Sequence, residues 1–345
     1  MFDIAIIGAG ASGLMAASVL TNQKVALIDG NGKIAEKIKI SGGAKCNITN
    51  KYLDESYYDG SSKLLQNTFK QFNNHDLLSF CNKNKLFPKI NEKIVKGTYF
   101  CNNSSDVIDM FSKLTTHIKK YMNTKVISVD FCNDIFVIKT DNQIIEAKKL
   151  IVASGGLSYA SLGASDIGYI IAKKFNHTIT RLDPALVGFT VQPSESWFKD
   201  LSGLSVDAEI TVGDKKLEGK FLFAHKGCSG PVVLSSSLYW KKGSLQVNFL
   251  PHKDSYLPKR VRQKIKELGI DPKNYIFAPA GNFGYTKAEV TRGGVSTDEI
   301  NENFESIKQK GLYFIGEVLD VTGELGGYNF QWAFSSAFVC AKSLD

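Results

Sequence analysis

The sequence predicts an α/β fold: a parallel sheet covered by helices and extended by a β-meander, with a second, mainly β domain inserted into it. The chain opens on an apolar run, a glycine-rich turn and helix-forming residues. Its third quarter alternates apolar and polar residues, and its C-terminal part returns to strand and helix patterns. At 345 residues it exceeds the size at which one hydrophobic core keeps growing, so two domains are expected.

The first residues predict a complete β-α-β unit. Residues 2–7 (FDIAII) form an apolar strand, 11–20 favour a helix, and 25–29 (VALID) form a second short strand. A loop rich in Gly, Lys and Asn is expected over 33–50, followed by helical structure over 61–85. This opening is the core of the first domain.

Later segments complete that domain. Alternating residues over 125–131 and 134–140 predict the β-meander, and the apolar run 149–156 (KLIVASGG) returns the chain to the parallel sheet. The segment 312–320 is again a strand, and a helix is expected to begin near Gln331.

The expected domain borders follow from a change of pattern between these segments. From about 186 to 285 the chain shows alternating strands and one short basic helix. We therefore expect one domain over 1–185 and 286–345 and an inserted β-rich domain over 186–285.

The inserted segment also carries most of the net charge. The whole chain has a formal charge of +8, and residues 186–285 hold 14 Lys or Arg against 9 Asp or Glu, a local +5. Within it, 258–269 places Val261, Ile265 and Leu268 on one face of a helix. The basic residues elsewhere on this helix are Lys259, Arg260, Arg262, Lys264 and Lys266. Two interpretations stay open: a solvated surface helix, or a patch that contacts RNA phosphates.

Composition excludes several classes. No apolar run reaches the roughly 18 to 20 residues that a membrane-spanning helix needs, and the N-terminus lacks the basic region of a secretory signal. Six cysteines occur without a C-x-x-C pair, so no disulfide framework and no metal site is expected. These features favour a cytoplasmic protein without a membrane partner. No pattern specifies an oligomeric state.

The glycine-rich turn matches the dinucleotide-binding fingerprint G-x-G-x-x-G at Gly8, Gly10 and Gly13. In this motif the first glycine makes the turn, the second admits a pyrophosphate, and the third packs helix on strand. Asp29 follows Gly13 by sixteen residues, at the end of the next strand, where a carboxylate can accept the ribose hydroxyls. Because the turn lies between a predicted strand and a predicted helix, dinucleotide binding is favoured over a turn without a ligand.

The position of the fingerprint favours FAD over NAD. It lies at the extreme N-terminus, and a distant C-terminal segment completes the domain, as in large flavoproteins. No second G-x-G-x-x-G occurs. NADH or NADPH is therefore expected to bind transiently, as an electron donor, or by another mode.

The sequence resembles the bacterial flavoproteins of the BaiN/RdsA (YhiN-like) type, within the FAD/NAD(P)-binding Rossmann-like superfamily. The resemblance rests on segments spread along the chain: IIGAGASGLMAA, ISGGAKCNITN (40–50), SGGLSY (154–159), AHKGCSGP (224–231), VTRGGV (290–295) and GEVLDVTGELGGYNFQWAFSSA (316–337). Two departures occur. The family usually has S-G-G-G-R-C-N where this chain has Ser41-Gly42-Gly43-Ala44-Lys45-Cys46-Asn47, and the insert is shorter than usual, which leaves the substrate range open.

The resemblance implies where FAD would bind. Ser41, Gly42 and Gly43 correspond to a second glycine-rich loop around the cofactor, and Glu317 to a carboxylate that holds the ribityl chain. A helix beginning after Gly327 would direct its N-terminus at the reduced flavin. The implied cofactor-binding residues are Gly8, Gly10, Ala11, Ser12, Gly13, Asp29, Gly30, Lys37, Ser41, Gly42, Gly43, Cys46, Asn47, Val126, Ala153, Gly155, Gly316, Glu317, Gly327, Tyr328 and Asn329.

Two residues are candidate proton donors. Cys46 lies beside Lys45 in a glycine-rich loop, where a thiol with a lowered pKa could protonate a substrate carbon; the alternative is a small buried apolar filler. His225 is a candidate second acid or substrate hydrogen-bond donor, against a structural role.

The resemblance implies an FAD-dependent, NAD(P)H-driven oxidoreductase that reduces an activated C=C bond conjugated to a carbonyl. Family members suggest two substrate classes: uridine in large-subunit rRNA, reduced to dihydrouridine, and steroid-like bile acid intermediates. The basic insert favours RNA, because a polyanion needs several cations for binding. Two alternatives stay open: a small-molecule ene-reductase or oxidase, and a noncatalytic flavin-containing protein that docks on RNA.

Overall fold

The computed structural model describes residues 1–91 and 95–345, and the contacts within it divide the chain into two compact units. The first unit contains the described residues before 92, Gly97–Asp183 and Thr291–Asp345; the second contains Pro184–Val290. The sequence places the domain borders at 185/186 and 285/286. We keep these borders as a proposal, and the division into two units supports it.

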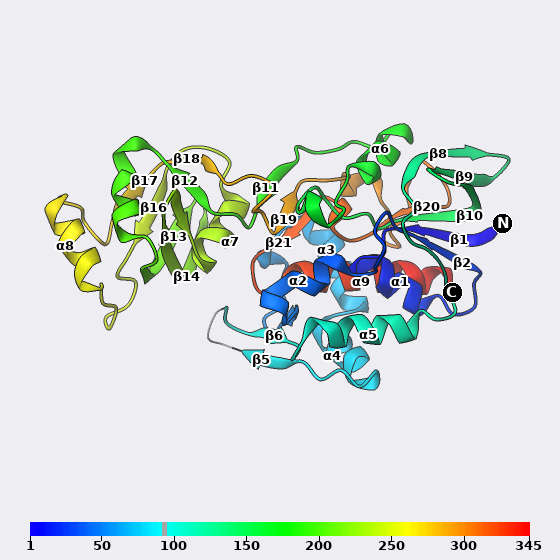
Figure 1. Ribbon diagram of the computed structural model, residues 1–345, viewed down its shortest axis with the longest axis horizontal. Helices are drawn as coiled ribbons and strands as arrows, with labels where there is room; N and C mark the ends of the chain where they lie inside the picture. The colour runs from blue at the N-terminus through cyan, green and yellow to red at the C-terminus, as the bar shows by residue number, and fades with distance from the viewer. Residues whose placement is uncertain (92–94) are drawn as a thin grey trace. The chain divides into compact units, whose positions relative to one another are not determined.

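The first unit is built on a sheet that confirms the predicted fold class. Its described strands run in the order β7-β2-β1-β10-β9-β8, and β20 also pairs with β10 (Figure 1). The strands are β1 (Phe2–Ile7), β2 (Val25–Ile28), β7 (Lys119–Tyr121), β8 (Val126–Cys132), β9 (Ile135–Thr140), β10 (Ile144–Val152) and β20 (Leu312–Phe314). The pairs β1–β2, β1–β10, β2–β7 and β10–β20 are parallel, whereas β8, β9 and β10 form the antiparallel meander.

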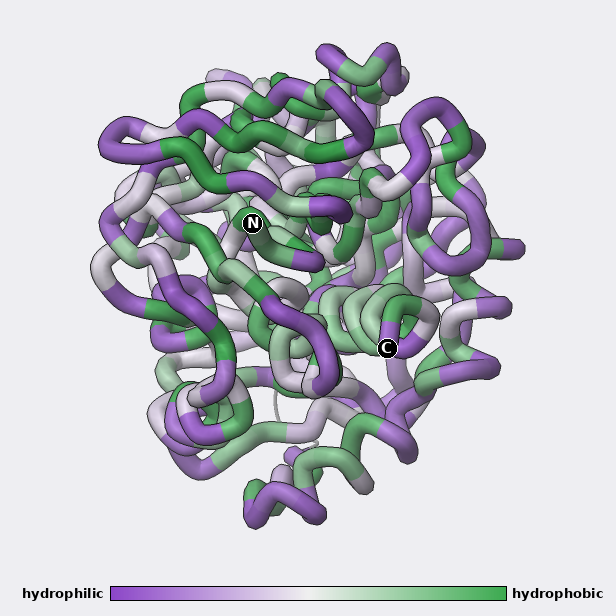
Figure 2. Tube along the Cα trace, turned by 90° about the vertical axis from the view of Figure 1, so that its right-hand side faces the viewer, coloured by the Kyte–Doolittle hydropathy of each residue, from purple (hydrophilic) through white to green (hydrophobic). Residues whose placement is uncertain are grey.

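Burial explains why the parallel strands are almost purely apolar. Ile6 lies opposite both Leu27 and Ile151, and all three side chains are inaccessible to solvent. The helices α1 (Ala11–Val19), α5 (Ser104–Leu114) and α9 (Tyr328–Leu344) lie along one side of β1 and β2 (Figure 1). Figure 2 shows the last of these, which ends at the C-terminus, in mostly apolar colours. Strands covered in this way must be hydrophobic on their covered faces.

The structure corrects one sequence prediction in this unit and refines two others. The loop predicted over 33–50 is wrong, because it contains helix α2 (Glu36–Ala44) and strand β3 (Asn47–Asn50). The helical region 61–85 is two helices, α3 (Ser62–Gln71) and α4 (Asn74–Lys83), separated where Asn73 forms a capping box with Asp76. Helix α9 begins at Tyr328, before the predicted start near Gln331.

Smaller elements complete the first unit and the places where the chain enters and leaves it. Strand β3 pairs with β6 and β6 with β5, β21 pairs with β4, and β11 pairs with β19. Their bounds are β4 (Tyr58–Gly60), β5 (Lys89–Asn91), β6 (Thr98–Phe100), β11 (Asp183–Ala185), β19 (Val290–Arg292) and β21 (Val321–Gly323). The remaining helical segments are α6 (Ile167–Lys174) and the 3-10 turns η1 (Glu55–Tyr57), η2 (Ala160–Leu162), η4 (Thr297–Glu299) and η5 (Gly316–Val318).

The second unit is mainly β, as predicted. Its strands run in the order β17-β16-β13-β14-β15-β12-β18, and all the pairs are antiparallel. The strands are β12 (Phe189–Val191), β13 (Ser205–Val212), β14 (Lys215–Ala224), β15 (Gly227–Ser229), β16 (Leu245–Asn248), β17 (Tyr275–Phe277) and β18 (Pro279–Asn282). Fully buried phenylalanines form much of its core: Phe189, Phe198, Phe221, Phe223, Phe249 and Phe277.

Three helical segments accompany this sheet: η3 (Pro193–Leu201), α7 (Pro231–Tyr239) and α8 (Lys259–Glu267). Only α8 was predicted. Helix α7 is buried along most of its length, so its apolar and serine residues show no amphipathic period, although Pro231 at its first turn is a typical start signal. None of the helices in the described part of the chain is long and apolar enough to cross a membrane.

Candidate functional site

The three glycines of the fingerprint serve different structural purposes. Gly8 has φ +108°, and a Cβ there would lie 2.3 Å from the carbonyl oxygen of Ala153. A Cβ on Gly13 would lie 1.8 Å from the carbonyl oxygen of Gly8. A Cβ on Gly10 would meet no atom within 4 Å. The fold itself therefore requires Gly8 and Gly13, whereas Gly10 keeps space open in front of helix α1.

Helix α1 presents its first backbone N–H groups at that space. Its N-cap is Gly10, which has no side chain to cap it. Ala11, Ser12 and Gly13 form the first turn, whose N–H groups have no partner within a helix. Uncapped donors and the positive end of the helix dipole form a binding site for phosphate.

Asp29 lies at the end of β2 and orders the turn beside it. Its carboxylate accepts hydrogen bonds from the Ala9 N–H at 2.6 Å and the Asn31 N–H at 2.7 Å. Burial raises the pKa of Asp29 even though these bonds oppose the rise. The Thr124 N–H donates to the Asp29 carbonyl at 2.9 Å, which brings the start of β8, Val126, into the same region.

The ends of β1 and β10 meet at this turn. The Ala153 N–H donates to the Ile7 carbonyl at 2.8 Å, so Ala153 directly adjoins Gly8. Two residues later Gly155 has φ +72°, and a Cβ there would lie 3.7 Å from Oε2 of Glu317. The parallel sheet thus brings residues 8–13, 29, 153–155 and 317 to one edge, where ligands of this fold bind.

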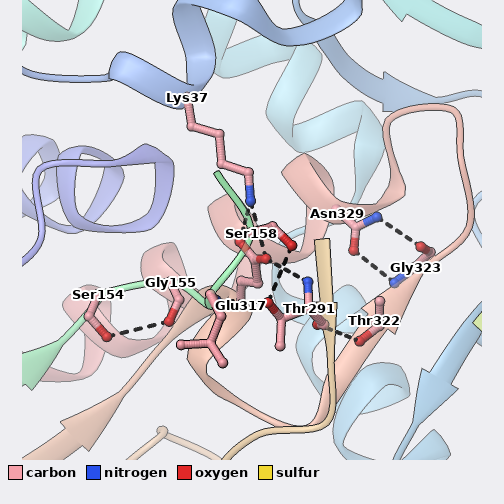
Figure 3. Close-up of polar contacts among 10 residues, drawn as sticks. Lys37, Ser154, Gly155, Ser158, Thr291, Glu317, Thr322, Gly323 and Asn329 are labelled. Atoms are coloured by element: carbon pink, nitrogen blue, oxygen red, sulfur yellow. Dashed lines mark hydrogen bonds and ion pairs between the residues drawn. The ribbon is translucent and has the colours of Figure 1, made fainter. Parts of the chain in front are cut away.

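Glu317 is held by an ion pair and a backbone hydrogen bond (Figure 3). Lys37 Nζ lies 2.9 Å from Oε2 and 3.2 Å from Oε1 of Glu317, and the Thr291 N–H donates to Oε1 at 3.0 Å. Thr291 is buried, and its Oγ1 accepts from the Leu157 N–H at 2.8 Å. Sequence reasoning assigned no role to Thr291, although the segment VTRGGV that contains it carried part of the family resemblance.

Gly316 joins three elements of the first unit. It has φ +74°, its N–H donates to Ser336 Oγ at 3.0 Å, and its carbonyl accepts from Trp332 Nε1 at 3.1 Å. A Cβ on Gly316 would lie 2.6 Å from Ser12 Oγ. Helix α9 therefore fixes the backbone that carries Glu317 against the first turn of α1.

The N-terminus of α9 is a second uncapped helix start. Its N-cap, Gly327, has φ +97° and packs against Thr49. The Asn329 side chain exchanges hydrogen bonds with Gly323, at 2.9 Å from its N–H and 2.8 Å from its carbonyl oxygen. The hydroxyl of Tyr328 donates to the Tyr52 carbonyl at 3.1 Å. These side chains are engaged in holding the turn. The groups that could bind a ligand here are therefore the backbone N–H groups at the start of α9.

The second glycine-rich loop bends the end of α2. Gly42 and Gly43 have φ +55° and +64°, both are exposed, and Ser41 Oγ donates to the Ile38 carbonyl at 2.8 Å. Asn47 Oδ1 is buried against Gly42 without a hydrogen-bond partner among the described residues. A pocket of about 490 Å³ adjoins this loop, lined by Lys39, Ile40, Gly43, Ala44, Asn103, Ser104, Ser105 and Ile108.

The predicted low pKa of Cys46 is wrong. The thiol is completely buried, and burial raises its pKa to about 12 despite a hydrogen bond with Ser41. Lys45 is exposed and does not change this. A side chain enclosed on all sides by protein cannot reach a substrate carbon, so the structure favours the small buried filler.

The candidate residues of the second unit are all accessible to some degree. His225 is exposed in the turn between β14 and β15. On α8, Lys259, Arg260, Arg262 and Lys266 are exposed and Lys264 is half-buried. The predicted face of Val261, Ile265 and Leu268 is only partly buried, because Leu268 is 49% exposed.

The residues present fit an FAD molecule. Open space at Gly10, uncapped N–H groups at two helix starts and a carboxylate at the end of β2 are the groups that an adenine dinucleotide requires. Glu317, oriented by Lys37 and Thr291, is a further carboxylate at the same edge of the sheet. When FAD is bound, it supplies two-electron redox chemistry, and the protein supplies binding and electrostatics.

This fold and this set of cofactor-binding groups are those of the FAD-dependent oxidoreductases, and the chain is an enzyme of that class. It belongs to the HI0933-like family, whose Rossmann-domain model matches residues 2–343. This match confirms the resemblance seen in the sequence. Because the chain is an enzyme, the alternative of a noncatalytic flavin-containing protein is rejected.

The alignments with two curated relatives cover nearly the whole chain. A ribosomal RNA dihydrouridine synthase of Escherichia coli is 34% identical over 394 aligned positions, which cover 99% of this chain and 98% of the relative. A 3-dehydro-bile acid delta(4,6)-reductase of Clostridium scindens is 27% identical, with 99% of both chains covered. The FrdA chain of E. coli quinol fumarate reductase shares the fold, with a TM-score of 0.56 at 13% identity, covering 99% of this chain and 69% of that one.

Proposed function

We propose that the enzyme reduces uridine to dihydrouridine in large-subunit rRNA, with NADH or NADPH as electron donor. The observation that carries this proposal is the 34% identity, along 99% of the chain, to a relative named for that reaction. The excess of Lys and Arg in residues 186–285 supports it, because affinity for RNA depends on cations that contact phosphates. A ribosomal RNA substrate would place the enzyme in the cytoplasm.

In this reaction the protein must hold the cofactor and deliver a proton. The N–H groups of α1 would bind the pyrophosphate, Asp29 the ribose hydroxyls and Glu317 the ribityl chain. The start of α9, with its positive dipole end, would stabilise negative charge on the reduced cofactor. A uracil ring has a C=C bond conjugated to a carbonyl, and its reduction adds a hydride to one carbon and a proton to the other.

The proton donor in this proposal is not Cys46, because its thiol is fully buried. His225 is the other predicted acid, and its ring is exposed in the turn after β14. An exposed imidazole can donate a proton or a hydrogen bond to a substrate carbonyl. We propose His225 for that role.

A small-molecule substrate is the second candidate. The observation that favours it is the 27% identity, over the same share of the chain, to a relative named as a bile acid reductase. The chemistry is related, since a C=C bond conjugated to a ketone also accepts a hydride and a proton. A bile acid carries a single carboxylate, however, so it needs few of the basic residues of the second unit.

The test compares rRNA from cells with and without the gene. We expect dihydrouridine in large-subunit rRNA to disappear on deletion and to return with the cloned gene; unchanged dihydrouridine would contradict the RNA substrate. Purified protein should carry FAD whose absorption band bleaches with NADH or NADPH. If a steroid enone reoxidises the bleached flavin and rRNA does not, the second candidate is established instead.

A further inference from the structure

We infer that α8 and the adjacent Tyr256 form a contact surface for an unpaired RNA segment, with Lys259, Arg262 and Lys266 on its phosphates and Tyr256 on a base. This inference rests on the proposed RNA substrate and deepens it. It divides the five basic residues of the helix into two sets with different tasks.

The first set holds the helix to its own unit. Lys264 Nζ lies 3.1 Å from Asp200 Oδ2 and 3.6 Å from Glu267 Oε2. The Arg260 guanidinium donates to the Asp200 carbonyl at 2.5 Å. Asp200 belongs to η3, so both side chains join α8 to that segment. Each of them already has a partner on the protein, which makes it a poorer contact for phosphate.

The second set projects from the opposite side of the helix. Val261 and Ile265 are buried, at 0% and 4% exposure, and define the inner face. Lys259, Arg262 and Lys266 stand at positions i, i+3 and i+7, which at 3.6 residues per turn form one row on the flank of the helix away from Arg260 and Lys264. All three are exposed, and none of the described residues forms an ion pair with them. At 1.5 Å per residue the row extends over about 10 Å, long enough to follow more than one phosphate.

Tyr256 adds a group that a purely electrostatic surface does not need. Its side chain is 78% exposed, the highest among the large apolar and aromatic residues of the described chain, and no described ring packs on it. It precedes Pro258, the N-cap of α8, by two residues, and is therefore three positions from Lys259 along the chain. An aromatic ring beside a row of cations is the usual arrangement for binding single-stranded nucleic acid, because bases stack on the ring while cations contact the backbone. A paired duplex keeps its bases stacked inside and offers no such face.

The experiment uses the full-length FAD-bound enzyme and a fluorescent 20-nucleotide RNA containing uridine, alone or annealed to its complement. Variant one replaces Lys259, Arg262 and Lys266 by Gln. The control replaces Lys241, Lys242 and Lys273 by Gln. These lysines are also exposed in the same unit, and their replacement removes the same charge. Tyr256→Ala is compared with Tyr256→Phe. Thermal unfolding of every variant confirms that it is folded.

We expect the slope of log affinity against log salt to fall by about 2 in variant one and to stay near the wild-type value in the control. Tyr256→Ala should weaken binding of the single strand at least about fivefold, and Tyr256→Phe should not. Equal losses of slope in variant one and the control, an unaffected Tyr256→Ala, or a preference for the duplex would overturn the inference.

Activity separates this inference from the proposed function. If wild-type enzyme forms no dihydrouridine in large-subunit rRNA, the proposed function fails whatever the variants do. If wild-type enzyme forms dihydrouridine and variant one does so with unchanged affinity and rate, only the surface assigned here is wrong. In both cases bleaching of the flavin by NADH or NADPH should be the same in all variants, because none of these residues belongs to the cofactor site.

Discussion

Lys37 Nζ lies 2.9 Å from Glu317 Oε2, across 280 positions of sequence. The pair links α2, which follows the first β-α-β unit, to η5, which follows the last strand of the sheet. Both side chains are partly buried, so the attraction between them is less screened than at the surface. Together with the Thr291 N–H, Lys37 orients the carboxylate at the edge of the sheet where the cofactor would bind.

The first prediction concerns that carboxylate. Glu317→Gln removes the charge that Lys37 neutralises and leaves fewer acceptor sites, so we expect the FAD dissociation constant to rise roughly tenfold. Lys37→Met should have a similar effect, because it frees the carboxylate to move. The measurement is titration of the apoprotein with FAD. Lys148→Met, which removes an exposed ion pair with Asp3, is the matched control and should not change FAD affinity.

The second prediction separates two glycines of one motif. Gly13→Ala places a Cβ 1.8 Å from the Gly8 carbonyl oxygen, so we expect clear destabilisation, by several kcal/mol. Gly10→Ala places its Cβ in open space, so stability should change by less than about 1 kcal/mol while FAD affinity falls at least tenfold. Urea unfolding of the apoprotein and FAD titration measure the two effects. A Gly10→Ala variant that binds FAD normally would place the pyrophosphate elsewhere.

The sequence predicted those elements that depend only on residues close to one another in the chain. The strand at residues 2–7, the glycine turn and Asp29 are close in sequence, and their spacing alone defines a β-α-β unit. Thr291 was missed because its importance comes from contacts with Glu317 and Leu157, which are distant in the chain. Helix α2 was mistaken for a loop, since its glycines at 42 and 43 keep non-helical angles and conceal the helical residues before them.

The error at Cys46 has the same origin. A neighbouring lysine in the sequence predicts a lowered thiol pKa only if both side chains face the same medium. Here Lys45 is exposed, whereas Cys46 is fully buried with φ +53°. Burial cannot be derived from adjacency, because consecutive residues in an irregular loop can point in opposite directions.

The third prediction follows from that burial. Cys46→Ala should retain FAD and keep turnover within about threefold of the wild-type rate, with a loss of stability of about 1 kcal/mol from the small cavity. Turnover is measured as substrate-dependent oxidation of NADH or NADPH. A loss of roughly 100-fold or more, at unchanged stability, would restore the thiol as a proton donor.

A buried histidine in the first unit provides the last prediction. His177 Nδ1 lies 3.1 Å from Glu299 Oε2, and its Nε2 lies 2.7 Å from Ser306 Oγ. Burial would raise the pKa of Glu299, but hydrogen bonds from Lys308 and Thr178 outweigh it and lower that pKa to about 2. Burial lowers the pKa of His177, and the charge of Lys308 adds to this, while Glu299 opposes it.

These directions determine how stability depends on pH. The folded state keeps His177 neutral where the unfolded chain, with a pKa near 6.5, takes up a proton. The contribution of the neutral ring is therefore complete above about pH 6.5 and is lost as the pH falls below it, while Glu299 stays ionised. His177→Gln should reduce the free energy of unfolding by about 1–3 kcal/mol at pH 7.5 and flatten its decline between pH 7 and pH 5. Urea unfolding across that range measures both, with exposed His75→Gln as the control. If His177→Gln kept the wild-type decline, another group would have to carry it.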